Sequence, residues 1–266
     1  MSTLKLLHAT KVRAKLIMVQ GISPVRQRNQ SPSAVRHGER GDQTYLRLRE
    51  LIVRGRLEPN SPALESKLAL QLGVSRTPTR EALARLSGEG FLVAATNGRR
   101  TELVVAPLSA AQMHELWHLI GSLEGIAIAT VSTMGRERRR QLGAAMAEVN
   151  DELAAAVRKP RNVDRISELQ TEFHVCFMDA CTGAYLRRIY DAVRPHVQRY
   201  EWAYGTRAGA TYFRSIADHR AIIDAVGRGN GKQARKLIEQ HWANAVARTA
   251  ALVTPSSTRS RPTGDR

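Results

Sequence analysis

The segment LESKLALQLGVSRTPTREALARLSGEGFL, residues 64–92, constrains the fold more strongly than any other part of the chain. Leucines recur every fourth residue from Leu64 to Leu72, a spacing that predicts a helix with one apolar side. Gly73 predicts a tight corner after this helix, and Ser75 is a favourable N-cap for a second one. Two short helices joined by such a turn predict a helix-turn-helix unit.

The second helix of this unit separates its apolar and basic side chains. At about 100° per residue, Thr79, Leu83 and Leu86 share one face, which we expect to be buried. The side chains that point well away from this face are Arg76, Thr77, Arg80 and Ala84. A recognition helix enters the DNA major groove in this way, with its early residues at the base edges. The pattern therefore predicts a DNA-binding surface.

A β-hairpin is predicted directly after this unit. Asn-Gly at positions 97–98 is a strong turn signal, with short strands expected at 91–95 and 103–105. The arginines that follow suit a wing that lies along the DNA backbone or in the minor groove. The alternative is that a hairpin tip carries charge only for solubility. Upstream, we expect Asp42 to cap a helix at 43–54 and Pro62 to open the next helix.

Residues 42–109 as a whole resemble the winged helix-turn-helix domain of GntR-type bacterial transcription factors. The string LGVSRTPTREAL is close to the most recognisable sequence of that family. The resemblance implies that the DNA-binding residues are Ser75, Arg76, Thr77 and Arg80 of the recognition helix and Asn97, Gly98 and Arg99 of the wing.

The charge distribution agrees with a polyanion as partner. The chain has 266 residues and a formal charge of +17, and residues 1–108 hold 18 Lys/Arg against 8 Asp/Glu. The shorter part of the chain thus carries most of the excess, as a DNA-binding module should. An anionic membrane surface would also attract such charge. No lipid-binding helix or anchor motif accompanies it, so we expect no membrane partner.

The rest of the chain predicts helices only, so the fold class is mainly α. They are expected at 109–134, 136–158, 163–181, 184–204, 211–227 and 230–252. Ser109 and Gln112 form a capping-box pattern at the start, and Pro195 should kink or split the fourth helix. Two cysteines without metal-type spacing favour reduced thiols in a cytoplasmic protein.

The predicted organisation has four parts. They are a disordered basic arm at 1–40, the winged helix-turn-helix domain at 41–106, a helical ligand-binding and dimerisation domain at 107–253, and a disordered tail at 254–266. The helical part resembles the FCD effector domain of the FadR branch of the GntR family. HELWHLIGSLEGIA resembles its first helix, EFHVCFMDACTGAYLRRIY the segment with its first metal histidine, and ADHRAIIDAV and ARKLIEQHWANAV its final two helices.

This second resemblance implies a divalent-metal site. His174, His219 and His241 fall on the three histidine positions of the branch. The acidic position four residues before His174 is Gln170, whose neutral amide oxygen is a weaker ligand for Zn²⁺ or a similar ion. Three histidines alone can still hold zinc, with the fourth position open. The alternative is a metal-free pocket of hydrogen-bonded polar residues.

The expected effector pocket also departs from the pattern of the branch. The branch often has an arginine that pairs with an acidic ligand, and Ile120 occupies that position here. A carboxylate is one candidate for the effector. Either the effector is less acidic than those of the branch, or another arginine such as Arg187 or Arg194 replaces the missing one. His118 and His196 are further candidates for the border of the pocket.

Together these features favour a ligand-responsive transcription regulator, expected to be a repressor, that binds an inverted repeat in double-stranded DNA as a homodimer. The alternative from another class is a metal-dependent enzyme built on the histidines. It is disfavoured because no acidic residue is spaced near them in the sequence as an evident general base. A structural nucleoid protein would explain the charge but not the three histidines.

Overall fold

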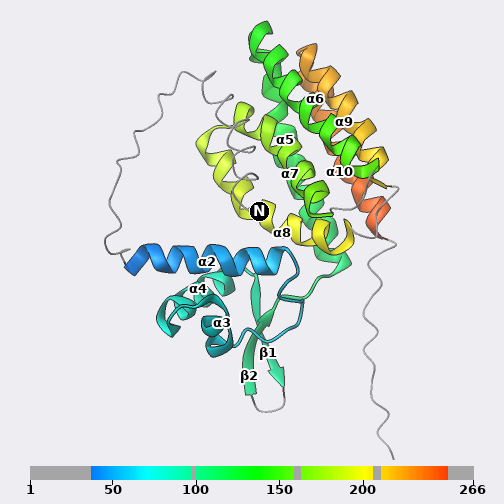
Figure 1. Cartoon of the computed structure of the whole chain (residues 1–266). Coiled ribbons are helices and arrows are strands. Elements are labelled where there is room, and N and C mark those ends of the chain that lie inside the picture. The colour runs from blue at the N-terminus through cyan, green and yellow to red at the C-terminus, as the bar shows by residue number, and fades with distance from the viewer. Residues whose placement is uncertain (1–36, 98–99, 159–162, 206–210, 251–266) are drawn as a thin grey trace, which may run out of the picture.

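Two separate apolar cores organise the chain in a computed structural model, which describes residues 37–97, 100–158, 163–205 and 211–250. The smaller core lies between the N-terminal helices and a hairpin, and it includes Tyr45, Leu48, Leu68, Leu86 and Phe91. The larger core lies within the C-terminal helices. Figure 1 shows the hairpin projecting from the small domain on the side opposite to the helical domain.

The small domain is a winged helix-turn-helix. Its helices are α2 (His37–Val53), α3 (Glu65–Leu72) and α4 (Arg76–Gly88), and its strands are β1 (Leu92–Asn97) and β2 (Arg100–Val105). The predicted apolar face of α4 is confirmed, because Thr79, Leu83 and Leu86 are buried. Gly73 ends α3 in the left-handed region at φ 66° and ψ 34°, where its N–H donates to the carbonyls of Ala69 and Leu70.

Three predictions for this domain were wrong in detail. α2 begins at His37, so Asp42 lies inside the helix and pairs with Arg85 of α4 (3.2 Å) instead of capping it. Leu64 precedes α3 and is half exposed. Pro62 does not open α3 but forms an isolated bridge to Val104, where its missing N–H leaves no ladder bond unmade.

The strands of the hairpin are longer than predicted. β1 and β2 pair antiparallel from Leu92 opposite Val105 to Asn97 opposite Arg100. The strand-like segment before α3 extends this sheet, because Ala63 N–H donates to the Leu103 carbonyl at 2.8 Å. The wing is therefore attached on both sides to the helix-turn-helix unit.

The helical domain follows the predicted boundaries closely. Its helices are α5 (Ala110–Ala129), α6 (Arg136–Arg158), α7 (Val163–Cys181), α8 (Ala184–Gly205), α9 (Thr211–Gly227) and α10 (Gly231–Ala250), with a short 3₁₀ turn η1 (Thr130–Thr133). α5 packs most extensively against α10 and also contacts α7 and α8, whereas α6 packs against α7 and α9. α8 also contacts α2 of the small domain (Figure 1).

The structure confirms the predicted cap of α5 but shows no split in α8. Ser109 is confirmed as the N-cap of α5, because its Oγ accepts from the N–H of Gln112 at 3.2 Å. The Gln112 side chain instead accepts a hydrogen bond from Tyr200 of α8 (3.3 Å). Pro195 does not split α8, which is continuous through it. The predicted arm falls outside the described residues up to position 36, as does the predicted tail at 254–266.

No described helix is both long and apolar enough to cross a membrane. Both cysteines are free thiols. Burial raises the pKa of Cys176 to about 12 and that of Cys181 to about 11, so both stay protonated at neutral pH.

Candidate functional site

The first turn of α4 presents the predicted DNA-binding residues to solvent. Ser75, Arg76 and Thr77 are exposed, while the next residues, Pro78 and Thr79, are buried and anchor the helix. The Ser75 side chain makes no capping hydrogen bond within the described structure. A helix fixed by its apolar face, with a hydroxyl and a guanidinium free at its N-terminal end, has the form of a major-groove reader.

Arg80 is exposed but not free. Its Nε and Nη2 donate to both carboxylate oxygens of Glu65 on α3, at 2.9 and 3.1 Å. The Arg80 side chain is 73% exposed and that of Glu65 27%, so the pair stands on the surface of the domain. This fork restrains the guanidinium and leaves its Nη1 edge directed away from Glu65.

The tip of the wing is only partly within the described structure. Asn97 lies at the end of β1 opposite Arg100, but its side chain falls outside the described residues. Gly98 and Arg99 also fall outside them. Their assigned contacts with DNA therefore stay predictions.

The three predicted metal histidines meet in the centre of the helical domain. His174 of α7, His219 of α9 and His241 of α10 each offer a ligand atom within 4.8 Å of the others. All three are buried, with 1, 0 and 4% of their surface exposed. The ring of Phe173 stacks on His219 with centroids 3.6 Å apart and fixes its plane. The fold thus brings together histidines that lie up to 67 positions apart in the sequence.

Each histidine has its Nδ1 engaged by a different neighbour. His174 Nδ1 lies 2.8 Å from Glu124 Oε2, His219 Nδ1 3.0 Å from Asn150 Oδ1, and His241 Nδ1 3.3 Å from Asp218 Oδ2. The remaining atom, Nε2, is then the one each ring can give to an ion. His219 Nε2 is buried and has no partner among the described residues. An orphaned lone pair inside a histidine cluster fits a divalent metal of the zinc type.

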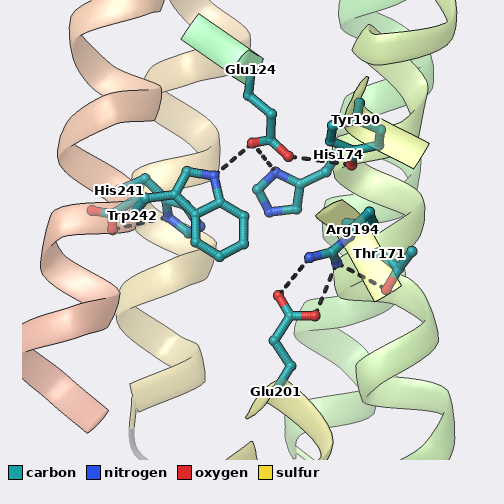
Figure 2. Close-up of polar contacts among 9 residues, drawn as sticks. Glu124, Thr171, His174, Tyr190, Arg194, Glu201, His241 and Trp242 are labelled. Carbon is teal, nitrogen blue, oxygen red and sulfur yellow. Dashed lines mark hydrogen bonds and ion pairs between the residues drawn. The ribbon is translucent and has the colours of Figure 1, made fainter. Parts of the chain in front are cut away.

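Glu124 organises one side of this cluster. It is fully buried on α5, where its Oε2 also accepts from Trp242 Nε1 (2.6 Å) and its Oε1 from the Tyr190 hydroxyl (3.3 Å), as Figure 2 shows. Burial alone would raise the pKa of Glu124, but His174 and its other donors lower it, so the carboxyl is ionised. An ionised acceptor fixes the His174 tautomer with the proton on Nδ1.

The remaining two histidines are held neutral. Burial lowers the pKa of His219 well below its ordinary value, and the neighbouring histidines lower it further. Burial also lowers the pKa of His241, against the opposing effect of Asp218. Neutral imidazole is the form that binds metals, so these rings do not need to lose a proton at pH 7.

A cavity of about 80 Å³ adjoins the histidines. Its polar walls come from Gln170 and Ser167 of α7, Tyr200 and Glu201 of α8, and Ser215 and Arg248 of the last two helices, with aromatic faces from Trp117, Tyr204 and Trp242. Gln170 therefore lies beside His174 and His241, where the resemblance placed a fourth ligand. The cavity is small against the roughly 300–1,000 Å³ of many ligand pockets, so it suits a compact molecule.

The other predicted pocket residues occupy different places. Arg194 is buried next to the cavity, where it donates two bonds to Glu201 (3.0 and 2.9 Å) and one to Thr171 (Figure 2). His118 is exposed on α5. Arg187 pairs with Asp179 and Asp191 away from the cavity lining.

His196 is also outside the cavity, at the contact between the domains. Its ring stacks on Phe91 of the small domain with centroids 4.0 Å apart and an angle of 12°. The assignment of His118, Arg187 and His196 to the pocket is therefore corrected. Sequence alone could not show that α8 turns this face toward the small domain.

Comparison with known proteins agrees with this geometry in both domains. Residues 40–102 match the family model "Bacterial regulatory proteins, gntR family", and residues 115–244 match the FCD domain. The chain belongs to the GntR family of bacterial regulators. This GntR-family chain is 25% identical over 202 residues to the "Uncharacterized HTH-type transcriptional regulator YdhC" of Bacillus subtilis, which covers 75% of this chain and 86% of the relative.

Two further comparisons give the same result. The chain is 29% identical over 206 residues to the "Probable D-xylose utilization operon transcriptional repressor" of Paenarthrobacter nicotinovorans, over 75% of this chain and 84% of the relative. The Escherichia coli structure McbR/YncC shares the fold with a TM-score of 0.66 at 19% identity, over 81% of this chain and 99% of that one. The matched domains and relatives are transcription regulators, so this GntR-family protein is a regulator and not an enzyme.

Sequence reasoning missed three residues of the histidine site. Glu124, Asn150 and Asp218 orient the three rings from the Nδ1 side. A signal existed for two of them, because Glu124 and Asn150 are polar residues within the apolar faces of their helices. Acidic residues do therefore approach the cluster, but on the side away from the shared Nε2 atoms. They orient ligands and do not stand where a general base would act on bound water.

α8 connects the cavity of this GntR-family regulator to its DNA-binding domain. Tyr200 lines the cavity, and its hydroxyl accepts from the Ser109 N–H (3.2 Å) at the start of α5. The adjacent Arg199 is buried and donates to the Ala106 carbonyl at 2.6 Å. Successive residues of one helix thus contact the cavity and the segment that joins the two domains.

Proposed function

We propose that the protein is a ligand-responsive repressor that binds an inverted-repeat operator as a homodimer in the cytoplasm. The observation that carries the proposal is the exposed N-terminal turn of α4, in which Arg76 and Thr77 face solvent on a helix anchored by buried residues. Two such helices related by a two-fold axis would read two half-sites. The name of the Paenarthrobacter relative, a repressor, supports the direction of control.

The resident metal belongs to this proposal. His174, His219 and His241 would hold a zinc-like ion through Nε2, with Gln170 as a weak fourth ligand or the position left to the effector. When bound, the ion supplies a Lewis-acidic position for an oxygen of the effector. Histidine and glutamine ligands are all neutral, so only the carboxylates behind the rings, Glu124 and Asp218, offset its charge of two. The open position next to the ion therefore favours an anionic effector.

The proposed response runs through α8. An effector in the cavity would contact Tyr200, whose hydroxyl is bonded to the first residues of the helical domain. The same helix stacks His196 on Phe91 of the DNA-binding domain. The effector can release the operator only if it binds more tightly to an arrangement of the domains that does not fit DNA. A shift of α8 provides the structural difference between such arrangements.

The proposed dimer has a candidate interface on α5 and α8. Of the five large apolar side chains that are exposed in the described part of the helical domain, four lie on these two helices: Leu119, Ile126, Tyr185 and Ile189. α5 and α8 pack against each other, so these side chains stand on two neighbouring helices. A second copy of the chain would bury it.

Charging this region should separate the dimer. The double variant Ile126→Glu/Ile189→Glu places carboxylates where apolar contact is expected, and we predict that its molar mass by light scattering after size exclusion is half that of the wild type. Phe213→Glu on α9 is the matched control, since Phe213 is similarly exposed (52%) but lies on another helix. A charged variant that stays dimeric would rule out this interface.

Selection from a randomised duplex library tests the function itself. The full chain, as purified, should enrich a sequence with two symmetric half-sites, and enrichment should fall as salt rises because phosphate contacts contribute to affinity. A library that shows no enriched sequence after repeated rounds would overturn the proposal. An enriched sequence without two-fold symmetry would overturn the homodimeric mode of binding.

A further inference from the structure

Two buried side chains of the cavity carry hydrogen-bond donors that have no partner among the described residues. Trp117 of α5 and Ser167 of α7 are 3% and 4% exposed, and neither the indole N–H nor the hydroxyl is paired. A donor that loses water without gaining an acceptor destabilises the folded protein. A ligand that provides the missing acceptor removes this cost for donors in a cavity wall.

The two donors lie at the same end of the cavity. Ser167 precedes His174 by seven residues on α7, and Trp117 precedes Glu124 by seven residues on α5. Glu124 and His174 are hydrogen-bonded to each other, so these two residues lie at the same height in the bundle. Seven residues make two helical turns, or about 10 Å along the axis. The donors thus lie about two turns from the histidines, at the end nearest the DNA-binding domain.

α10 contributes a cation to the cavity wall between this end and the histidines. Arg248 follows His241 by seven residues and lines the cavity. The polar contacts of its guanidinium are long: Nη1 lies 3.6 Å from Asp218 Oδ2, and Nη2 lies 3.4 Å from Ser215 Oγ. By contrast, Arg194, which is buried beside the cavity, makes a close two-bond fork with Glu201. Arg248 is therefore the cation of the cavity wall that can still turn to an anion.

We infer that Trp117, Ser167 and Arg248 form an oxyanion subsite that binds a carboxylate group of the effector. This distal subsite provides the anion contact that Ile120, buried and aliphatic, cannot make. The effector is then a short dicarboxylate, with one carboxylate in the distal subsite and the other facing the histidines. This inference rests on the proposed function, which supplies the effector and the metal that attracts the second carboxylate.

Calorimetric titration of the zinc-loaded full-length protein tests the subsite. The probes are glutarate and adipate, with valerate as the monocarboxylate matched to glutarate. Trp117→Phe and Ser167→Ala each remove one donor and keep most of the shape, and each should weaken binding of the preferred diacid about tenfold or more. Trp202→Phe is the control, since Trp202 packs against the core of the small domain and should leave affinity unchanged.

A second measurement separates a binding role from a structural one. Because the Ser167 hydroxyl is unpaired in the free protein, Ser167→Ala should raise the melting temperature in the absence of acid by a few degrees while it lowers acid affinity. A hydroxyl with a structural partner would give a lower melting temperature. That result would overturn the inference.

The remaining outcomes are equally decisive. The subsite is wrong if both variants bind the diacids as the wild type does, or if the wild type binds none of the probes. Valerate binding as tight as the best diacid would refute the second carboxylate. The library selection reports on the proposed function separately. If an operator is enriched but no acid binds, the proposed function stands and the subsite is wrong. If the acids bind in a variant-sensitive way but no operator is enriched, the subsite stands and the proposed function is wrong.

Discussion

Zinc should raise the melting temperature of the metal-free protein by about 10 °C, and His219→Ala should abolish this rise. An ion that binds only the folded state at a thousandfold excess over its dissociation constant stabilises it by about 4 kcal/mol. A domain of this size gains roughly 2–4 °C per kcal/mol. His219 is the decisive position because its Nε2 is buried and without a partner among the described residues. Differential scanning calorimetry of chelator-treated protein with and without zinc measures the effect.

His118→Ala is the matched control for this experiment. It removes a histidine from the same domain, but His118 is exposed on α5 and lies away from the cluster. Its zinc response should equal that of the wild type. An equal loss in both variants would show that zinc binds to surface histidines, and an unchanged response in His219→Ala would exclude the buried site.

The zinc effect should also depend on pH in a defined direction. Burial holds the pKa of His219 well below the ordinary 6.5 and lowers that of His241. Above pH 6.5 both rings are neutral in the folded and unfolded chain, so zinc binds without displacing protons from them. As the pH falls below 6.5 the unfolded chain takes up protons first, which reduces the stability of the metal-free fold. Zinc binding itself should weaken only as the pH passes through the lowered folded values.

The helical elements could be predicted from sequence because their signals are local. Apolar periodicity, Gly and Pro breaks and the Ser109 cap define α6, α7 and α9 at the observed residues. Errors occurred where tertiary contacts override local preference. Asp42 has the chemistry of a cap, but α2 begins at His37 and Asp42 instead pairs with Arg85 of α4.

The members of the histidine cluster could be predicted from the sequence, whereas the walls of the cavity could not. His174, His219 and His241 could be placed from sequence only through the resemblance to the FadR branch, because they lie on three different helices. The cavity walls depend on how α8 is rotated between the two domains, and periodicity does not fix that rotation. His196 and Tyr200 are one helical turn apart, yet one stacks on Phe91 and the other lines the cavity. In the sequence Glu124 is an isolated acidic residue of an apolar helix. Only the structure shows that Trp242 and Tyr190 donate hydrogen bonds to it.

Arg76→Ala/Arg80→Ala should lower affinity for the selected operator at least a hundredfold. Each arginine that contacts a base edge or phosphate contributes about 1–3 kcal/mol, and a dimer loses the contacts of both subunits. Fluorescence anisotropy with a labelled duplex measures the loss at fixed salt. Arg136→Ala/Arg140→Ala removes the same charge from exposed positions on α6 and should change affinity only slightly. Equal losses in the two double variants would mean that net charge, not the recognition helix, drives binding.

The Arg80–Glu65 pair makes a further distinction possible within the recognition helix. Glu65 accepts two bonds from Arg80 and also places a negative charge on the DNA-facing surface. Glu65→Gln removes that charge and loosens the fork, so affinity for a scrambled duplex should rise severalfold. Preference for the operator over the scrambled duplex should fall, because a guanidinium free to rotate selects its base less well. If the preference stays at the wild-type value, Glu65 does not position Arg80, and the exposed pair contributes only to the stability of the small domain.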